Sequence, residues 1–324
     1  MACVRRGTIA AMTIALLVLL VESPRAWNGI GHQVVARIAW DNMTPAARRN
    51  AIALLQAAPA GACLRELFSS DPRPPEIRQR EFFMRASTWP DIVRPQDASD
   101  TRPCTRFHRR DWHFINFFWQ GTSGATNAER PRDRTDVDVP ELNGVERLSL
   151  LRPLVVCAVP ACGTQTADRA TALAWILHIV GDLHQPLHTS ARVTARPDEQ
   201  RGDQGGNLFK LETTSTPLSL HGFWDGIVNR SMPQASTEPE SVYLNRLATA
   251  IMTKHPRVQL ASRIRSGEFT VWAREGFETT KQRVYPANLQ RGRMPSDEYR
   301  AAAFATSEQS IALAGYRLVF RRLR

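Results

Sequence analysis

The chain has 324 residues, 43% of them hydrophobic, which is enough for one large domain or two small ones with a substantial core. Its formal net charge of +11 suits polyanionic partners such as nucleic acid or phosphate-rich surfaces, although a solvated basic surface gives the same number. Beyond the N-terminus no stretch approaches the roughly 20 apolar residues of a membrane-spanning helix. Repeats, low-complexity tracts and an evident linker are also absent from the sequence.

The N-terminus has the layout of a secretory signal peptide. Arg5 and Arg6 precede an apolar run over residues 8–21, and small residues follow up to Ala26. Cleavage after Ala26 would take the formal charge from +11 to +9 and leave one domain over residues 27–324. We therefore expect a secreted or periplasmic protein without a membrane partner after cleavage. An uncleaved membrane anchor is the alternative.

Apolar periodicity predicts a mainly α chain with a single domain. The first predicted helix runs through Val34 and Ala39, and the second begins with Thr44 as N-cap and Pro45 as its first residue. The second helix and those that follow it are expected at about 45–56, 80–89, 140–156, 168–183, 240–254, 270–285 and 296–319. Loops are predicted for 59–79 and for 120–139, the latter as a mobile surface loop. A small β-hairpin near 205–221, with strands over 205–212 and 217–221, is the only clear β signal.

Four cysteines remain after residue 26, and an even number in an exported chain suggests disulfides, with three possible connectivities. Cys157 and Cys162 flank a short loop and are the preferred pair, which leaves Cys63 with Cys104. None forms a Cys-x-x-Cys pair, so binding of a metal by thiolates is not expected.

Polar residues concentrate at the end of the apolar run 170–183. His178 and Asp182 are four residues apart and share one face of the predicted helix. Pro186 should end or kink the helix, which lets His188 turn back toward the same point. Imidazoles and a carboxylate are costly to bury without compensation, and a metal ion compensates them because neutral His and ionised Asp are zinc ligands. A hydrogen-bond network in the core is the alternative.

Other histidines strengthen the metal hypothesis. His221 and Asp225 repeat the His-x3-Asp spacing, His32 stands near the expected mature N-terminus, and His113 lies in an aromatic segment. His108 and His255 have polar neighbours and are interpreted as surface residues.

Several motifs occur in an order found in one known family. They are Trp-x4-His from Trp27, Trp-x-Asp-x2-Arg over 89–94, His-Phe-Ile-Asn over 113–116, His-x3-Asp-x5-His over 178–188, and His-x3-Asp over 221–225. The chain resembles the zinc-dependent, single-strand-preferring nucleases of fungi, plants and bacteria, which share a superfamily with zinc-dependent phospholipase C. The resemblance covers residues 27–324 and implies a helical bundle of that type with three Zn²⁺ ions in a cleft.

The resemblance also implies a ligand set for each zinc ion. The three sets are Asp91, His113, His178 and Asp182; then His188, His221 and Asp225; and finally the amino nitrogen and carbonyl oxygen of Trp27 with His32 and a shared oxygen of Asp182. All are N and O donors that zinc accepts. An α-amino group has a pKa of about 7.7–8.0, so a nearby cation can deprotonate it near neutral pH. Signal cleavage would then be a condition for assembling the site.

By the same resemblance, Asp91, Arg94 and Asp182 take part in catalysis. A hydroxide between the zinc ions joined by Asp182 is the implied nucleophile, and the third ion steadies the departing 3′ oxygen, which yields 5′-phosphorylated products. Arg94 matches a phosphate-contacting position, although it also suits a helix end. Phe114 matches a base-stacking aromatic, although it also suits the core.

Two further positions in the motifs concern specificity and support. Asn116 replaces the Asp with which the fungal enzymes hydrogen-bond the base, so the base preference stays open. His184 is expected to support the ligands rather than bind a metal, and Trp119 is a weaker candidate for a substrate contact.

The sequence therefore predicts a monomeric, exported zinc endonuclease for single-stranded DNA and RNA, with 3′-nucleotidase activity. A zinc-dependent phospholipase C is the first alternative. The short Trp-x4-His spacing and Asp225, where the phospholipases carry Glu, argue against it by resemblance. A non-catalytic protein stabilised by zinc is the second alternative. The second ligand set offers three protein ligands rather than four, which favours catalysis.

Overall fold

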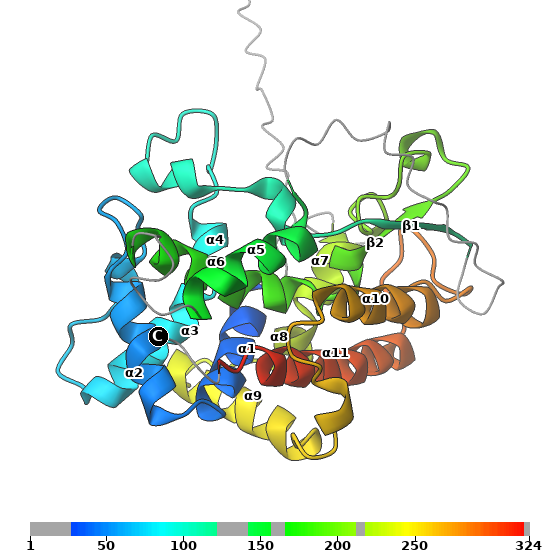
Figure 1. Ribbon diagram of the computed structural model, residues 1–324. Helices are drawn as coiled ribbons and strands as arrows, with labels where there is room; N and C mark the ends of the chain where they lie inside the picture. Colours follow the sequence, from blue (N-terminus) through cyan, green and yellow to red (C-terminus); the bar gives the residue numbers. More distant parts are fainter. Residues whose placement is uncertain (1–26, 122–141, 157–165, 212–217, 321–324) are drawn as a thin grey trace, which may run out of the picture.

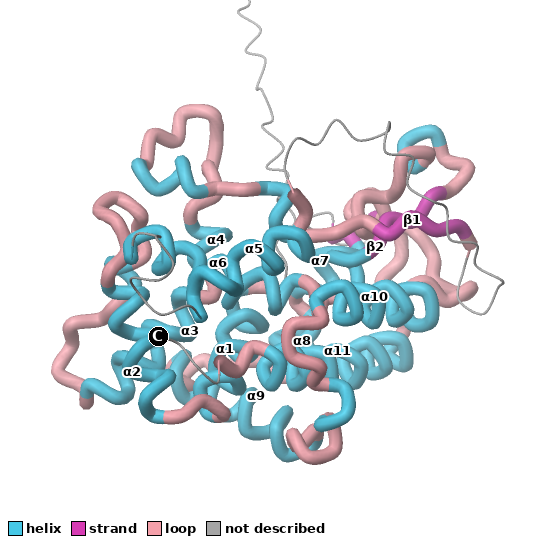
Figure 2. Tube along the Cα trace, in the orientation of Figure 1, coloured by secondary structure: helices cyan, strands magenta, loops and turns pink. Residues whose placement is uncertain are grey.

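The computed structural model describes residues 27–121, 142–156, 166–211 and 218–320. The expected signal peptide, nearly all of the predicted loop 120–139, the Cys157–Cys162 pair and the tip of the predicted hairpin lie outside these residues. Within them the protein is mainly helical, and its few strands are short and lie at one edge (Figure 1 and Figure 2). No helix in these ranges combines the length and apolar character that crossing a membrane requires.

The α-helices of the described residues are α1 (Gly29–Asp41), α2 (Pro45–Gln56), α3 (Pro75–Ala86), α4 (Trp89–Ile92), α5 (Gly144–Val156), α6 (Thr166–Asp182), α7 (Leu220–Asp225), α8 (Ile227–Ser231), α9 (Glu240–Lys254), α10 (Phe269–Thr279) and α11 (Asp297–Arg317). The strands are β1 (Phe117–Gln120), β2 (Ser190–Val193), β3 (Lys210–Leu211) and β4 (Leu218–Ser219). Short 3₁₀ turns lie at Arg65–Leu67, Pro103–Phe107, Arg110–His113, Pro186–Thr189, Pro197–Glu199 and Ala261–Arg263, and a π-helical turn at Thr280–Val284.

Helix α6 is the centre of the fold. It packs against α1, α2, α4, α5 and α11, and almost every residue after its first turn is buried. Helix α1 lies between α6, α11, α9 and α3. A Cβ at Gly315 of α11 would lie 2.5 Å from the Ile38 side chain of α1, so a glycine is needed for this close helix contact. A helix enclosed on all sides needs an apolar sequence all round, as α6 has.

Most of the predicted helices are confirmed. Thr44 caps α2, since its hydroxyl accepts a hydrogen bond from the Ala47 amide at 3.2 Å. The predicted loop 59–79 was wrong at its end, because α3 already begins at Pro75, a favourable first helical residue. The predicted helix 270–285 is α10 up to Thr279 and then a π-helical turn.

The predicted hairpin is confirmed but shorter. Strand β3 pairs with β4 in antiparallel fashion, with Lys210 opposite Ser219 and Leu211 opposite Leu218. The residues before β3 form turns instead of a strand, because residues 204–206 have positive φ angles. The predicted second strand ends at Ser219, whose hydroxyl accepts from the Gly222 amide and caps α7.

One strand pair was not predicted. Strands β1 and β2 are parallel, with Phe117 opposite Ser190 and Gln120 opposite Val193. The pairing joins segments that are far apart in the sequence, so a local pattern could not reveal it. It brings the chain that follows His113 next to the chain that follows His188, and the Ile115 amide donates to the His188 carbonyl at 2.9 Å.

Cys63 and Cys104 form a disulfide with a Cα–Cα distance of 5.7 Å, as the sequence predicts. The bond ties the segment after α2 to the 3₁₀ turn that precedes the aromatic segment, and Cys104 is fully buried. A cross-link over 41 residues restricts the unfolded chain and so stabilises the folded state.

We predict that a Cys63→Ala/Cys104→Ala variant loses about 2–4 kcal/mol of unfolding free energy. Thermal unfolding followed by circular dichroism would measure the change. A variant with the melting temperature of the wild-type protein would contradict a stabilising role for this disulfide.

Candidate metal centre

The C-terminal end of α6 presents His178 and Asp182 on one face, as their spacing predicts. Both side chains are fully buried, and His178 Nε2 lies 3.2 Å from Asp182 Oδ2. Two further imidazoles approach the same carboxylate: His32 Nε2 lies 3.2 Å from Oδ1 and His113 Nδ1 lies 3.1 Å from Oδ2. Asp91 is at the edge of this group, with Oδ1 4.0 Å from His178 Nε2.

The helical scaffold leaves space for this convergence. The His32 ring, from α1, stacks on the His178 ring with centroids 4.0 Å apart. It also lies against Gly181 of α6, where a Cβ would come within 2.7 Å of His32 Nδ1. A side chain at position 181 would therefore displace the imidazole from the carboxylate.

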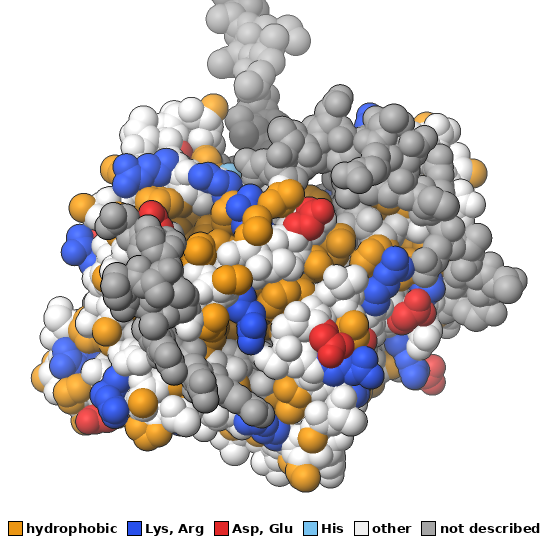
Figure 3. All heavy atoms as spheres, viewed as in Figure 1, with side chains coloured by type: hydrophobic (Ala, Val, Ile, Leu, Met, Phe, Trp, Pro, Cys, Tyr) orange, Lys and Arg blue, Asp and Glu red, His pale blue; other side chains and the backbone are white. Residues whose placement is uncertain are grey.

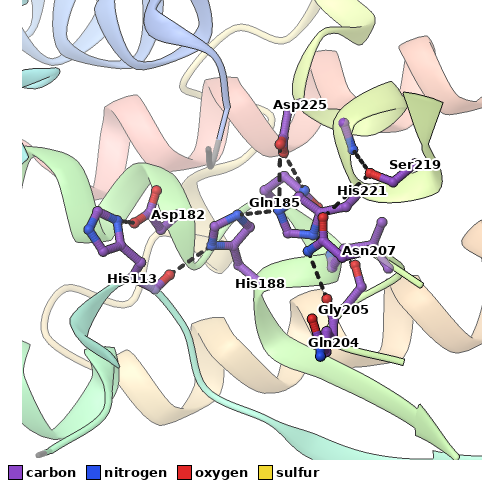
Figure 4. Close-up of polar contacts among 12 residues, drawn as sticks. His113, Asp182, Gln185, His188, Gln204, Gly205, Asn207, Ser219, His221 and Asp225 are labelled. Carbon is purple, nitrogen blue, oxygen red and sulfur yellow. Dashed lines mark hydrogen bonds and ion pairs between the residues drawn. The ribbon is translucent and has the colours of Figure 1, made fainter. Parts of the chain in front are cut away.

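A second group consists of His188, His221 and Asp225, all buried (Figure 4). His188 Nε2 lies 3.0 Å from His221 Nε2, which lies 3.5 Å from Asp225 Oδ2. The Gln185 amide donates to Asp225 Oδ1 at 2.7 Å and so fixes that carboxylate. Sequence reasoning missed Gln185, whose only sequence signal is its place between two metal-ligand candidates.

Backbone carbonyls set the tautomers of three imidazoles. The Nδ1 atoms of His178, His188 and His221 each lie 2.7 Å from a carbonyl oxygen, those of Ser87, His113 and Gly205 respectively. A carbonyl oxygen can only accept, so each Nδ1 carries the hydrogen and each neutral ring has a lone pair on Nε2. At the His188–His221 pair two such lone pairs therefore face each other at 3.0 Å. A cation between the rings turns this repulsion into coordination.

The protonation states agree with this interpretation. Burial is the main cause that lowers the pKa of His32, His113 and His188 well below 6.5 and that of His221 to about 4. These rings are thus neutral near pH 7, because each imidazolium loses its proton at a lower pH than a free imidazolium does.

Burial shifts the pKa of the carboxyl groups of Asp182 and Asp225 in the opposite direction. Burial raises the pKa of Asp182 and Asp225 well above 3.8, because the charged form is disfavoured in an apolar interior. A bound cation would favour the charged form and reverse that shift.

Several buried polar atoms have no hydrogen-bond partner among the described residues: both ring nitrogens of His32, His113 Nε2 and Asp182 Oδ1. Buried polar atoms without partners are costly unless a ligand satisfies them. Three groups have ligand atoms within 4.8 Å of one another: His32, Asp91 and His178; His113, His178 and Asp182; His188, His221 and Asp225. The first two groups share His178. The N and O donors present are those that zinc takes, so the residues fit this metal.

Trp27 lies beside the second group. Its side chain is fully buried, and the next amide, of Asn28, donates to the Asp225 carbonyl at 3.1 Å. Asn28 also caps α1 by accepting from the Gly31 amide, which fixes the helix that carries His32.

Three imidazoles of these groups, those of His113, His188 and His221, line a cleft of about 620 Å³, called here the metal-centre cleft. The lining includes Arg94, Phe114 and Asn116 from the predicted set, and Arg94 Nη2 lies 3.2 Å from Asp91 Oδ1. It also includes residues that the sequence did not suggest: His108, Arg110, Gln204 and Asn207.

His108, interpreted from its polar neighbours as a surface residue, is half-buried. Its ring lies in the cleft wall, with its centroid 6.4 Å from that of His113. The polar neighbours of His108 in the sequence concealed this position, because a 3₁₀ turn over Arg110–His113 brings both rings to one side. His184 is not part of the metal centre: its Nδ1 donates to the Val180 carbonyl and its Nε2 accepts from Arg317 at 2.8 Å.

Three groups of mostly buried His and Asp side chains beside an open cleft define a helical protein with candidate metal sites. Comparison with known proteins gives the family. The model of the S1/P1 Nuclease family matches residues 27–320, and the chain belongs to this family. The match favours the nuclease interpretation over the phospholipase.

Individual relatives are distant. Nuclease S1 of Aspergillus oryzae is 20% identical over 246 residues, which cover 76% of this chain and 67% of the relative. Endonuclease 2 of Arabidopsis thaliana is 24% identical over 157 residues, 45% of this chain and 49% of the relative. Endonuclease 4 of the same plant is 33% identical over 60 residues, 18% of this chain and 17% of the relative.

We predict that Asp182→Asn lowers the metal content of the zinc-loaded protein by about two ions, because an amide is a poorer ligand and Asp182 faces the ligands of more than one group. Elemental analysis of the purified protein would measure this. Glu308→Gln is a matched control, since Glu308 is a buried carboxylate of α11 outside the three groups. Full zinc content in the Asp182 variant would refute the shared role.

Proposed function

We propose that the protein is an exported zinc-dependent endonuclease. It hydrolyses phosphodiester bonds of single-stranded DNA and RNA to 5′-phosphorylated products, and it also acts as a 3′-nucleotidase. The observation that carries the proposal is the cluster of mostly buried His and Asp side chains in three groups, of which His113, His188 and His221 line the metal-centre cleft. Family membership and the names of the relatives, nuclease S1 and two endonucleases, support the same reaction.

Three zinc ions would be held by the ligand sets that the sequence motifs suggest. Asp91, His113, His178 and Asp182 hold one; His188, His221 and Asp225 hold another; the Trp27 terminus, His32 and Asp182 hold the third. When bound, zinc supplies Lewis-acid stabilisation of phosphoryl charge and a nucleophile at neutral pH. The protein's part is to fix these ligands, and its backbone carbonyls orient three of the rings.

Arg94 binds the phosphate in this mechanism. Its guanidinium lines the metal-centre cleft and is oriented by Asp91, so donors are available where the phosphodiester would lie. Planar, paired N–H donors stabilise the charge that develops on phosphoryl oxygens during transfer.

Phe114 and Asn116 account for the single-strand preference. Both are half-buried and line the cleft, so a ring face and an amide are available to one base. A base can stack on Phe114 only when it is unstacked from its neighbours, as in a single strand. The Asn116 amide both donates and accepts, so it pairs with more than one base edge.

Charge and export complete the proposal. Lys and Arg side chains are spread over the face shown in Figure 3 instead of forming one patch, which gives a general attraction to polyanions. We propose that residues 1–26 direct the chain out of the cytoplasm, that cleavage frees the Trp27 amine for the metal, and that the enzyme works as a monomer.

The direct test is a side-by-side assay of zinc-loaded protein on single-stranded DNA, single-stranded RNA, a 3′-mononucleotide and phosphatidylcholine. We expect cleavage of the nucleic acids with 5′-phosphate ends, loss of activity after chelation and recovery with zinc. Cleavage of the lipid alone would replace the nuclease assignment with a phospholipase. Nucleic-acid binding without hydrolysis would make the protein a zinc-stabilised binding protein.

A second prediction concerns the N-terminus. A protein that keeps one extra residue before Trp27 lacks the amine at that position, so we expect it to lose one of its zinc ions and most of its activity. N-terminal sequencing together with zinc counting, on this variant and on a protein starting at Trp27, would measure both effects. Equal zinc content and equal turnover in the two proteins would refute the role of the Trp27 amine.

A further inference from the structure

The segment between β2 and β3 lines two hollows. Gln204 and Asn207 face the metal-centre cleft, whereas Arg196, Glu199 and Phe209 line a separate hollow of about 510 Å³. The second hollow also receives Arg192 from β2, and Tyr285 and Arg291 from the loop after α10. We call it the arginine cleft. The loop after α10, orange in Figure 1, passes beside this segment, and the Gly292 amide donates to the Lys210 carbonyl.

Arg192 is the cation of the arginine cleft that has no carboxylate partner within the described residues. Its guanidinium lies over the Tyr285 ring, 4.8 Å from the centroid, and 5.7 Å from that of the buried Trp119. Its Nε is buried and has no hydrogen-bond partner in the part of the chain that the structure describes. Stacking on aromatic rings holds a guanidinium in place without neutralising it, so the charge stays available to an anion.

The other two arginines are already paired with carboxylates. Arg291 stacks on Phe209 at 4.2 Å and forms an ion pair with the buried Glu199. Arg196 is exposed and pairs with Asp198 at 3.1 Å. With three arginines and one glutamate in its lining, the arginine cleft is positive, and Arg192 is its uncompensated group.

The floor of the arginine cleft is fixed before any ligand arrives. The buried Asp203 accepts the Arg192 amide at 2.9 Å and the Tyr285 hydroxyl. Glu199 accepts the Thr194 hydroxyl at 2.6 Å in addition to its bond with Arg291. A preorganised cationic site loses little conformational entropy on binding.

We propose that the arginine cleft binds a phosphodiester of the substrate strand away from the bond that is cleaved, with Arg192 as the phosphate ligand. The planar N–H donors of a guanidinium match phosphate oxygens. A polyanionic strand is the ligand that the proposed nuclease function brings to this surface, and one short segment lines both clefts. The proposal rests on that function. In this proposal Arg192 increases the activity on long substrates relative to short ones, and it takes no part in the hydrolysis step.

The test compares Arg192→Gln with wild type on two substrates, a dinucleotide and an oligothymidylate of about 30 nucleotides. One charged hydrogen bond contributes about 1.5–3 kcal/mol, so we expect kcat/KM on the oligonucleotide to fall about tenfold or more. The dinucleotide carries a single phosphodiester, the one that is cleaved, and so has no second phosphodiester for Arg192; its kcat/KM should not change. Binding of a phosphorothioate oligonucleotide, followed by anisotropy, should lose about 0.7 from the slope of log K against log salt, as for one phosphate contact to a single strand.

Two further variants serve as matched controls. Arg246→Gln removes the same charge from another arginine that stacks on a tyrosine, Tyr243 at 5.2 Å, on α9. It should leave both the salt slope and the oligonucleotide kinetics unchanged. Ala287→Glu places a carboxylate on an exposed residue of the arginine cleft without touching Arg192. It should weaken oligonucleotide binding even if Arg192→Gln does not fold.

Several results would overturn the proposal. Equal oligonucleotide affinity in wild type, Arg192→Gln and Ala287→Glu would rule out a phosphate site in the arginine cleft. An equal loss of activity on the dinucleotide would make Arg192 a support of the metal centre. Weaker binding of inorganic phosphate with unchanged oligonucleotide affinity would leave only a site for the free ion. If no substrate is cleaved by wild type, the nuclease proposal fails, whereas the anisotropy measurement still decides whether the arginine cleft binds a strand.

Discussion

The structure depends on one buried carboxylate surrounded by imidazoles. Asp182 is fully buried at the end of α6, with ring nitrogens of His32, His113 and His178 at 3.1–3.2 Å. A lone carboxylate in such an interior would be protonated, and neutral imidazoles that face one another gain nothing without a shared ligand. The arrangement becomes favourable when cations are bound, so metal binding and the packing of α1 and α6 stabilise each other.

The loops around α6 orient the ligands. A carbonyl oxygen fixes Nδ1 of His178, His188 and His221 in turn, and each carbonyl comes from a residue outside the α-helices: Ser87, His113 and Gly205. The Gly205 carbonyl reaches His221 only because residues 204–206 adopt positive φ angles, and a Cβ at Gly205 would lie 2.4 Å from the Leu187 carbonyl oxygen. Irregular backbone in this region is therefore a requirement of the site, which explains why the first hairpin strand is so short.

Local patterns in the sequence predict the helices and the ligand pairs well. The i,i+4 spacing of His178 and Asp182 and the apolar run before them predict a buried helix with both side chains on one face, as found. What local patterns could not show is contact between distant segments. Three features depend on chain segments that meet across the fold. They are the parallel pairing of β1 with β2, the position of His108 in the cleft wall, and the hydrogen bond from Gln185 to Asp225. The imidazoles and carboxylates named by the resemblance lie close together in three groups, because a motif order carries tertiary information that periodicity lacks.

The segment from β2 to β3 connects the metal centre to the arginine cleft. Its Asp203 holds the Arg192 backbone and Tyr285, and two residues later the Gly205 carbonyl holds His221. A strand that contacts both clefts is attached at two points, and the second contact then forms within one complex at a high effective concentration. In the proposed function, such attachment would strengthen binding of long strands without changing the reacting groups, because the role proposed for Arg192 is phosphate contact alone. The hydrogen-bonded connection would give a structural reason for the proposed preference: the segment that orients His221, a candidate metal ligand, also fixes the Arg192 backbone.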